Sequence, residues 1–186
     1  MSATIAHPLL CHPAAPCPAR HQVSASAHLT ADGTLALCFE LRGDADKLRI
    51  PAPQPPGAAD GLWQHTCCEA FVAAVDGAEY REFNLSPSGQ WAAYRFHAYR
   101  ERDAGFVPPV APQSDFRRTA DGFRLTAQLA PELLPPATVF QIGLTLVLEA
   151  SDGGKSYWAL AHCAEQPDFH LGQSFTLTLA RPICRP

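Results

Sequence analysis

Apolar and polar residues alternate with a period of two along most of the chain. Residues 23–29 alternate up to the turn signal Asp32-Gly33, and residues 35–41 alternate after it. Further alternating stretches flank Asp121-Gly122, and residues 138–151 form a long, largely apolar stretch. Because successive side chains of a strand point to opposite faces of its sheet, this pattern predicts β-strands and at least two hairpins.

Interruptions of the pattern come at short intervals. The Pro-rich stretches 51–61 and 100–113 are expected to be loops, since proline cannot donate to a strand ladder. No stretch of about 12 residues shows the 3.6-residue period of an amphipathic helix. We therefore predict an all-β protein, a single antiparallel β-sandwich of roughly nine to eleven strands without a helix longer than about 10 residues. The sandwich should span residues 21–186, with the Pro-rich segment 1–20 packed on it.

The stretch from residue 80 to residue 96 divides into two faces around its Ser-Pro-Ser-Gly turn. Phe83 and Leu85 before the turn, and Tyr94 and Phe96 after it, are expected to face the core. The opposite face of this hairpin and of its neighbouring strands mixes aromatic rings with acids, an amide, a histidine and an arginine. The candidate ligand-binding residues on this face are Trp63, His65, Glu69, Tyr80, Glu82, Asn84, Trp91, Arg95 and Glu149.

This mixture of side chains predicts a polar pocket that suits a saccharide. A tryptophan ring offers a flat apolar surface to the C–H face of a sugar. Glutamate and asparagine can bond its hydroxyl groups, and arginine adds fixed donors. The alternative interpretation is that Glu69, Glu82 and Arg95 form a structural network of ion pairs on a partly covered sheet.

Three stretches of the sequence resemble a known group of domains. They are "DGLWQHTCCEAFVA" (60–73), "YREFNLSPSGQW" (80–91) and "PDFHLGQSFTLTL" (167–179). Each is similar to a strand of the family-nine carbohydrate-binding modules and of DOMON domains. With "HPAAPCPA" near the start and "SYWALAH" near the end, the chain most resembles bacterial stand-alone DOMON-like proteins.

The resemblance implies an antiparallel β-sandwich whose concave sheet binds a sugar or a haem, and it does not imply catalysis. We therefore expect a non-catalytic domain that binds a saccharide or a sugar-containing metabolite, with no cofactor. Two alternatives stay open. Glu69 and Glu82 could be the paired carboxylates of a small glycosidase or isomerase. A haem-binding DOMON domain is the other alternative, although cytochromes of that superfamily use a methionine ligand and Met1 is the only methionine here.

Composition argues against nucleic acid and a membrane as partners, and the expected partner is a small molecule. The 186 residues carry a net charge of −4 with histidine neutral, and no basic patch stands out, so we expect no nucleic-acid partner. No apolar run approaches the ~18 residues of a membrane-spanning helix. The spacings of His65 with Cys67 and of His162 with Cys163 do not match zinc sites, so no metal is expected.

The seven cysteines help to predict the cellular compartment of the protein. Their number is odd, and no apolar stretch follows a basic start as in a signal peptide. We therefore expect a cytoplasmic protein in which all seven thiols are free.

Overall fold

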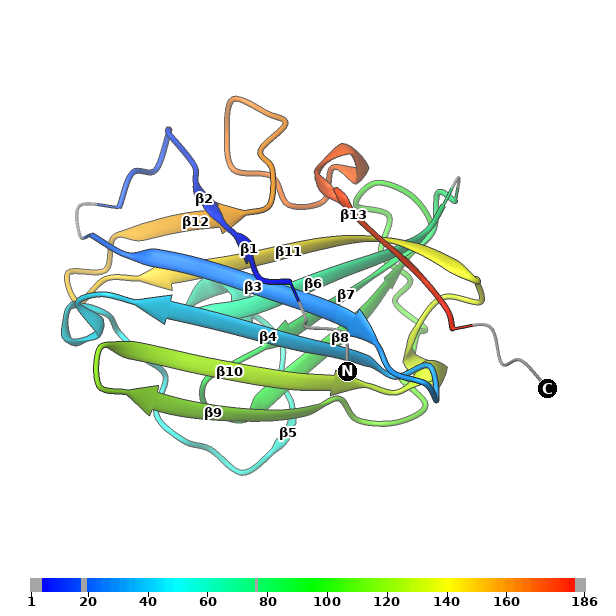
Figure 1. Ribbon diagram of the computed structural model, residues 1–186, viewed down its shortest axis with the longest axis horizontal. Helices are drawn as coiled ribbons and strands as arrows, with labels where there is room; N and C mark the ends of the chain where they lie inside the picture. The colour runs from blue at the N-terminus through cyan, green and yellow to red at the C-terminus, as the bar shows by residue number, and fades with distance from the viewer. Residues whose placement is uncertain (1–4, 18–19, 76, 183–186) are drawn as a thin grey trace.

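Two β-sheets packed face to face make up the fold, as Figure 1 shows. The computed structural model describes residues 5–17, 20–75 and 77–182. Within these ranges, ten strands of four or more residues and three two-residue strands are accompanied by four short 3-10 turns. The predicted all-β sandwich is therefore confirmed. No helix of the described ranges is long and apolar enough to cross a membrane.

The smaller sheet has five strands in the order β1-β3-β4-β10-β9, and all neighbours are antiparallel. It forms the front layer in Figure 1. Its strands are β1 (His7–Pro8), β3 (Gln22–Leu29), β4 (Leu35–Arg42), β10 (Gly122–Leu129) and β9 (Gln113–Thr119).

The larger sheet has the order β2-β12-β11-β6-β7-β8-β5, and β13 pairs with one end of β11. Only the short β5–β8 pair among its described strands is parallel. The strands are β2 (Leu10–Cys11), β12 (Lys155–Ala159), β11 (Val139–Glu149), β6 (Cys67–Ala74), β7 (Tyr80–Leu85), β8 (Gln90–Phe96), β5 (Gly57–Ala58) and β13 (Leu177–Ala180). The 3-10 turns are η1 (Ala45–Lys47), η2 (Leu62–Gln64), η3 (Pro131–Leu133) and η4 (Gly172–Ser174).

The core lies between the two sheets. In the larger sheet, Ala70 of β6 pairs with Phe83 of β7, and both side chains belong to the core cluster. Phe39 and Phe123 of the smaller sheet are fully buried in the same cluster. Alternate residues of the strands therefore meet between the layers, as the period of two predicts.

Both predicted turn signals join antiparallel strands. Gly33 follows β3 with a φ of 85°, a conformation that favours glycine. Gly122 opens β10 at its contact with β4. A Cβ atom there would lie 1.8 Å from the carbonyl oxygen of Leu41, so no other residue fits without a backbone shift.

The Pro-rich N-terminal segment contributes to both layers. It was expected to lie over the sandwich, and its described part adds β1 to the edge of the smaller sheet and β2 to the edge of the larger one. Leu9, between these strands, is buried in the core cluster. The six cysteines of the described residues have free thiols, and Cys184 lies outside those residues.

The faces predicted for β8 are wrong. Leu85 lies opposite Trp91, and Glu82 lies opposite Tyr94, so Trp91 shares the core face while Tyr94 shares the face of Glu82. Aromatic residues occur on both faces of β8, and its hydrophobic pattern therefore does not fix its register. The turn after Leu85 fixes it, through a backbone hydrogen bond from Ser86 N to Gln90 O (3.0 Å).

We predict that Phe83→Ala lowers the free energy of unfolding by about 3–5 kcal/mol, because it empties a fully buried site in the core. Urea denaturation measures the change. Val107→Ala is the control, since Val107 is 80% exposed and its truncation should change stability little. A loss for Phe83→Ala no larger than that of the control would contradict the inward orientation of this side chain.

Candidate functional site

A cleft of about 1290 Å³ lies over the outer face of the larger sheet, the face turned away from the core. Its floor consists of side chains from β6, β7, β8, β11 and β12. Its walls are the segment around η2, the loop after β8, residues 166–170 and two alanines of the N-terminal segment. The floor residues that line it are Glu69, Phe71, Glu82, Tyr94, Phe96, Val147 and Tyr157.

Two buried carboxylates lie on this floor. Glu69 of β6 is 2% exposed and Glu82 of β7 is 5% exposed. Asn84 donates a 2.7 Å hydrogen bond to Oε1 of Glu82, and the hydroxyl of Thr145 donates a 3.3 Å bond to Oε2 of Glu69. Oε1 of Glu69 is buried without a hydrogen-bond partner among the described residues. An unpaired buried oxygen of this kind costs free energy until a ligand or solvent group bonds it.

Burial is the main cause of the raised pKa values of Glu69 and Glu82. Burial, followed by the charge of Glu82, raises the pKa of Glu69 well above its usual range. Burial also raises the pKa of Glu82 to about 6, although the bond from Asn84 and the charges of Arg102 and Arg100 oppose this shift. The two carboxyl groups therefore hold a proton at pH values where exposed glutamates are ionised.

His170 lies beside Glu82 in a neutral state. Its Nε2 is 3.8 Å from Oε2 of Glu82, and its Nδ1 is 2.9 Å from the hydroxyl of Tyr80. Burial, with a contribution from the charge of Arg100, lowers the pKa of His170 to about 4. Since the Tyr80 oxygen already accepts a bond from Arg100 N (3.0 Å), we assign its proton to a bond toward Nδ1. This tautomer directs the Nε2 proton at Glu82.

An ion-pair clamp joins two of the loops around the cleft. Arg100 donates through Nη2 to Oδ1 of Asp168 (2.9 Å), and the hydroxyl of Tyr99 donates to Oδ2 of the same carboxylate (2.5 Å). Backbone N–H of His170 also donates to Asp168 (3.0 Å). The clamp fixes the loop after β8 against the segment that contains His170.

Aromatic rings form a second apolar cluster on this outer face. Tyr80 stacks on Phe96 with ring centroids 4.7 Å apart, and Phe71 stacks on Phe175 at 5.5 Å. Gly143 of β11 makes room for the second stack, because a Cβ atom there would lie 2.7 Å from the Phe175 ring. Tyr94 belongs to this cluster rather than to the core.

Four of the nine sequence-predicted residues line the cleft: Trp63, His65, Glu69 and Glu82. Tyr80, Asn84 and Glu149 lie on the same face and support the lining side chains. Asn84 supports Glu82 through a hydrogen bond, and Tyr80 supports His170 in the same way. Glu149 is bonded by His65 Nδ1 (2.7 Å) and by Arg49 Nη1 (2.8 Å). The bond from His65 anchors the segment around η2 to β11.

Trp91 and Arg95 do not belong to the cleft. Both lie on the opposite face of the sheet because of the β8 register. Trp91 packs against the core cluster, and Arg95 pairs with Asp103 and lies over the ring of Phe106. The predicted ion-pair network of Arg95 with the two glutamates is therefore wrong, and Arg95 stabilises the loop after β8 instead.

Sequence reasoning missed several lining residues. The sequence pattern places Tyr94 and Phe96 in the core, but both line the cleft because the turn after Leu85 sets the register of β8. Arg102 lies over the Tyr94 ring (4.0 Å to the centroid) and 3.5 Å from Asp60. The hydroxyl of Tyr94 donates to the same Asp60 (2.7 Å). Loop residues such as these carry no periodicity that would reveal their position.

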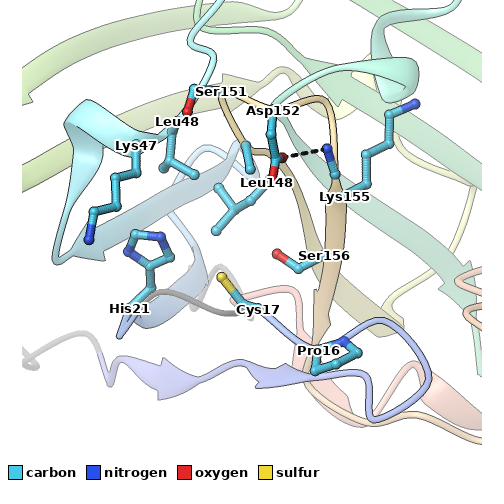
Figure 2. A pocket seen from close by; sticks show the side chains of 12 residues that line it. Pro16, Cys17, His21, Lys47, Leu48, Leu148, Ser151, Asp152, Lys155 and Ser156 are labelled. Carbon is cyan, nitrogen blue, oxygen red and sulfur yellow. Dashed lines mark hydrogen bonds between the residues drawn. The ribbon is translucent and has the colours of Figure 1, made fainter.

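A second, smaller cavity of about 280 Å³ lies between η1, β12 and the N-terminal segment, as Figure 2 shows. Asp152 there bonds its own turn at Gly154 N (2.9 Å), and the side chain of Lys155 points away from the cavity (Figure 2). Its charged groups therefore do not converge on a ligand. No group of three or more His, Cys, Asp or Glu side chains in the described ranges is placed to hold a metal ion.

The strand order and its two layers define a β-sandwich of the type found in family-nine carbohydrate-binding modules. A Bacteroides uniformis protein, provisionally named a carbohydrate-binding protein, matches with a TM-score of 0.72 and 15% identity, over 95% of this chain and 86% of its own. A family-nine module from Caldicellulosiruptor kristjanssonii, in complex with cellotriose, matches with a TM-score of 0.64 and 11% identity, over 95% and 82%.

A family-nine module from the same organism, in complex with glucose, matches with a TM-score of 0.56 and 12% identity, over 94% of this chain and 83% of its own. At these identities the comparisons establish the fold. No family model matches the sequence, and no curated protein is significantly similar to it.

We predict that Glu82→Gln removes a pH-dependent destabilisation. A carboxyl whose pKa rises on folding binds more protons in the folded state, so stability falls as the pH rises from its ordinary 4.5 through about 6. The amide can still accept the Asn84 bond but cannot ionise. Relative to wild type, the variant should gain on the order of 1–2 kcal/mol of unfolding free energy between about pH 5 and pH 7.

Urea denaturation across this pH range makes the comparison. Glu101→Gln serves as the matched control, since it makes the same substitution at an exposed glutamate that does not line the cleft. The assignment is contradicted if the Glu82→Gln difference varies with pH no more than that of the control.

Proposed function

We propose that the protein binds a small saccharide or sugar-containing metabolite in the cleft over the larger sheet, without chemistry. The observation that carries the proposal is the unbonded oxygen of Glu69, a buried acceptor on the floor of a cleft with aromatic lining. Two sandwiches of the same fold hold cellotriose and glucose, which supports a ligand of this class.

The lining chemistry fits a pyranose. Trp63 is 50% exposed at the entrance, where its ring can cover the C–H face of a sugar. Gln64 and Gln90 line the same cleft and offer amide donors and acceptors to hydroxyl groups. The glutamates below them supply acceptors, or a donor where one of them holds its proton. Apolar stacking above a polar floor orients the ligand.

We also propose that the chain is a DOMON-like relative of these modules and acts in the cytoplasm on a soluble metabolite. The sequence resemblance and the free thiols of the described cysteines support this proposal. A ligand of cytoplasmic origin would be a mono- or oligosaccharide or a nucleotide sugar rather than a polymer.

A glycosidase is the second candidate function, and the Glu69–Glu82 pair is the observation that favours it. A carboxyl that stays protonated beside a more acidic one is the arrangement that acid–base hydrolysis of a glycoside needs. Turnover of aryl glycosides, lost in Glu69→Gln, would identify the enzyme, whereas binding without turnover supports the non-catalytic function.

We predict that Trp63→Ala weakens saccharide binding by roughly tenfold through lost stacking, while the fold stays intact. Isothermal titration calorimetry with glucose, cellobiose, cellotriose and their amino-sugar counterparts measures it. Trp91→Ala is the matched control: it should cost stability, because its ring packs on the core, and leave affinity unchanged. Equal losses of affinity in both variants, or no binding of any saccharide by wild type, would overturn the proposal.

A further inference from the structure

The two carboxyl groups on the floor of the cleft have no hydrogen-bonded cation among the described residues. Glu69 has no ion-pair partner among the described residues, and Glu82 has only the 3.8 Å contact with His170. His170 is neutral at physiological pH, since its Nδ1 is engaged by Tyr80 and burial lowers its pKa to about 4. When both carboxyl groups are ionised, they therefore repel one another in a poorly hydrated place.

The two arginines that line the cleft are already committed to other acids. Arg100 pairs with Asp168 at 2.9 Å. Arg102 lies 3.5 Å from Asp60 and over the ring of Tyr94. Both guanidinium groups are half exposed at the walls. Their positive charges lower the pKa of Glu82 from a distance. Within the described part of the chain, neither guanidinium group is hydrogen-bonded to Glu69 or Glu82.

A ligand that brings one compact positive charge would complete this floor. An ammonium group has three donors, and among the described residues neither Oε1 of Glu69 nor Oε2 of Glu82 receives a hydrogen bond. A hydroxyl group in the same place would satisfy one acceptor and leave the repulsion in place.

We propose that the cleft selects a saccharide that bears a protonated amino group, whose ammonium binds to Glu69 and Glu82 while the sugar ring lies against the aromatic walls. The inference rests on the proposed saccharide-binding function and names the class of sugar. A bare metal ion fits less well, because no set of three His, Cys, Asp or Glu ligands converges in the described ranges.

Proton linkage follows from the groups that face the pair. An ammonium favours the ionised carboxylates, so binding displaces the protons that burial retains on the pair. Affinity therefore rises as the pH rises through about 6, where Glu82 ionises, until the amine itself loses its proton. The titratable and charged groups around the pair come from the floor strands and from the walls of the cleft. The floor strands contribute Cys67 (β6), Tyr80 (β7), Tyr94 (β8), Glu149 (β11) and Tyr157 (β12). The walls contribute Asp60 and His65 from the segment around η2, Arg100 and Arg102 from the loop after β8, and Asp168 and His170 from the segment 166–170.

Calorimetry with matched sugars tests the inference. Glucosamine is compared with glucose and N-acetylglucosamine, and the fully deacetylated chitosan trimer with cellotriose. We expect wild type at about pH 7 to bind the amino sugars at least about tenfold more tightly than their neutral counterparts. Titration in two buffers of different ionisation enthalpy should reveal proton release on binding by wild type, which needs no variant.

Variants then locate the preference. Glu69→Gln and Glu82→Gln should each remove most of it, whereas Glu101→Gln should keep it. If neutral sugars bind as tightly as amino sugars, this inference fails and the proposed function stands. If no saccharide binds, both fail. If the preference survives both glutamate substitutions, or binding releases no protons near pH 6, the assignment of the ammonium to this carboxylate pair is overturned.

Discussion

The pairing of β6 with β7 is the constraint on which the rest of the structure depends. Glu69 lies opposite Asn84, two residues along β7 from Glu82, so both carboxylates share one face. The same register places Ala70 against Phe83 in the core. A slip of β7 by one residue would put Glu82 between the sheets and Phe83 in the cleft. The core and the candidate site are thus fixed by one set of hydrogen bonds.

Burying two acids on one face costs stability, and the surrounding structure offsets part of this cost. Asn84 and Thr145 each bond one oxygen of the pair. The stacked rings of the outer cluster bury apolar surface on the same face. The Asp168–Arg100 clamp holds the loops over it. Oε1 of Glu69 has no hydrogen-bond partner among the described residues. This free acceptor suits the floor to a ligand rather than to a purely structural role.

The sequence was sufficient for the fold and for the faces of β6, β7 and β11, each of which carries one glutamate on the face opposite its core-facing apolar residues. It was not sufficient for β8, because Trp91, Tyr94 and Phe96 make both faces aromatic and only the turn geometry decides between them. It also could not place Arg100, Arg102 or Asp60, since loop positions depend on long-range contacts. His170 is hydrogen-bonded to Tyr80 and also lines the cleft.

The central claim is that two neighbouring carboxyl groups lie buried on the cleft floor with no hydrogen-bonded cation among the described residues. Carbon-detected NMR titration of the glutamate side-chain carboxyl groups, assigned with Glu69→Gln and Glu82→Gln, tests it most directly. The account predicts one titration near pH 6 and a second well above the ordinary range, and replacing either glutamate should remove one titration and shift the other. Titration of every glutamate near the ordinary value of about 4.3 would contradict it.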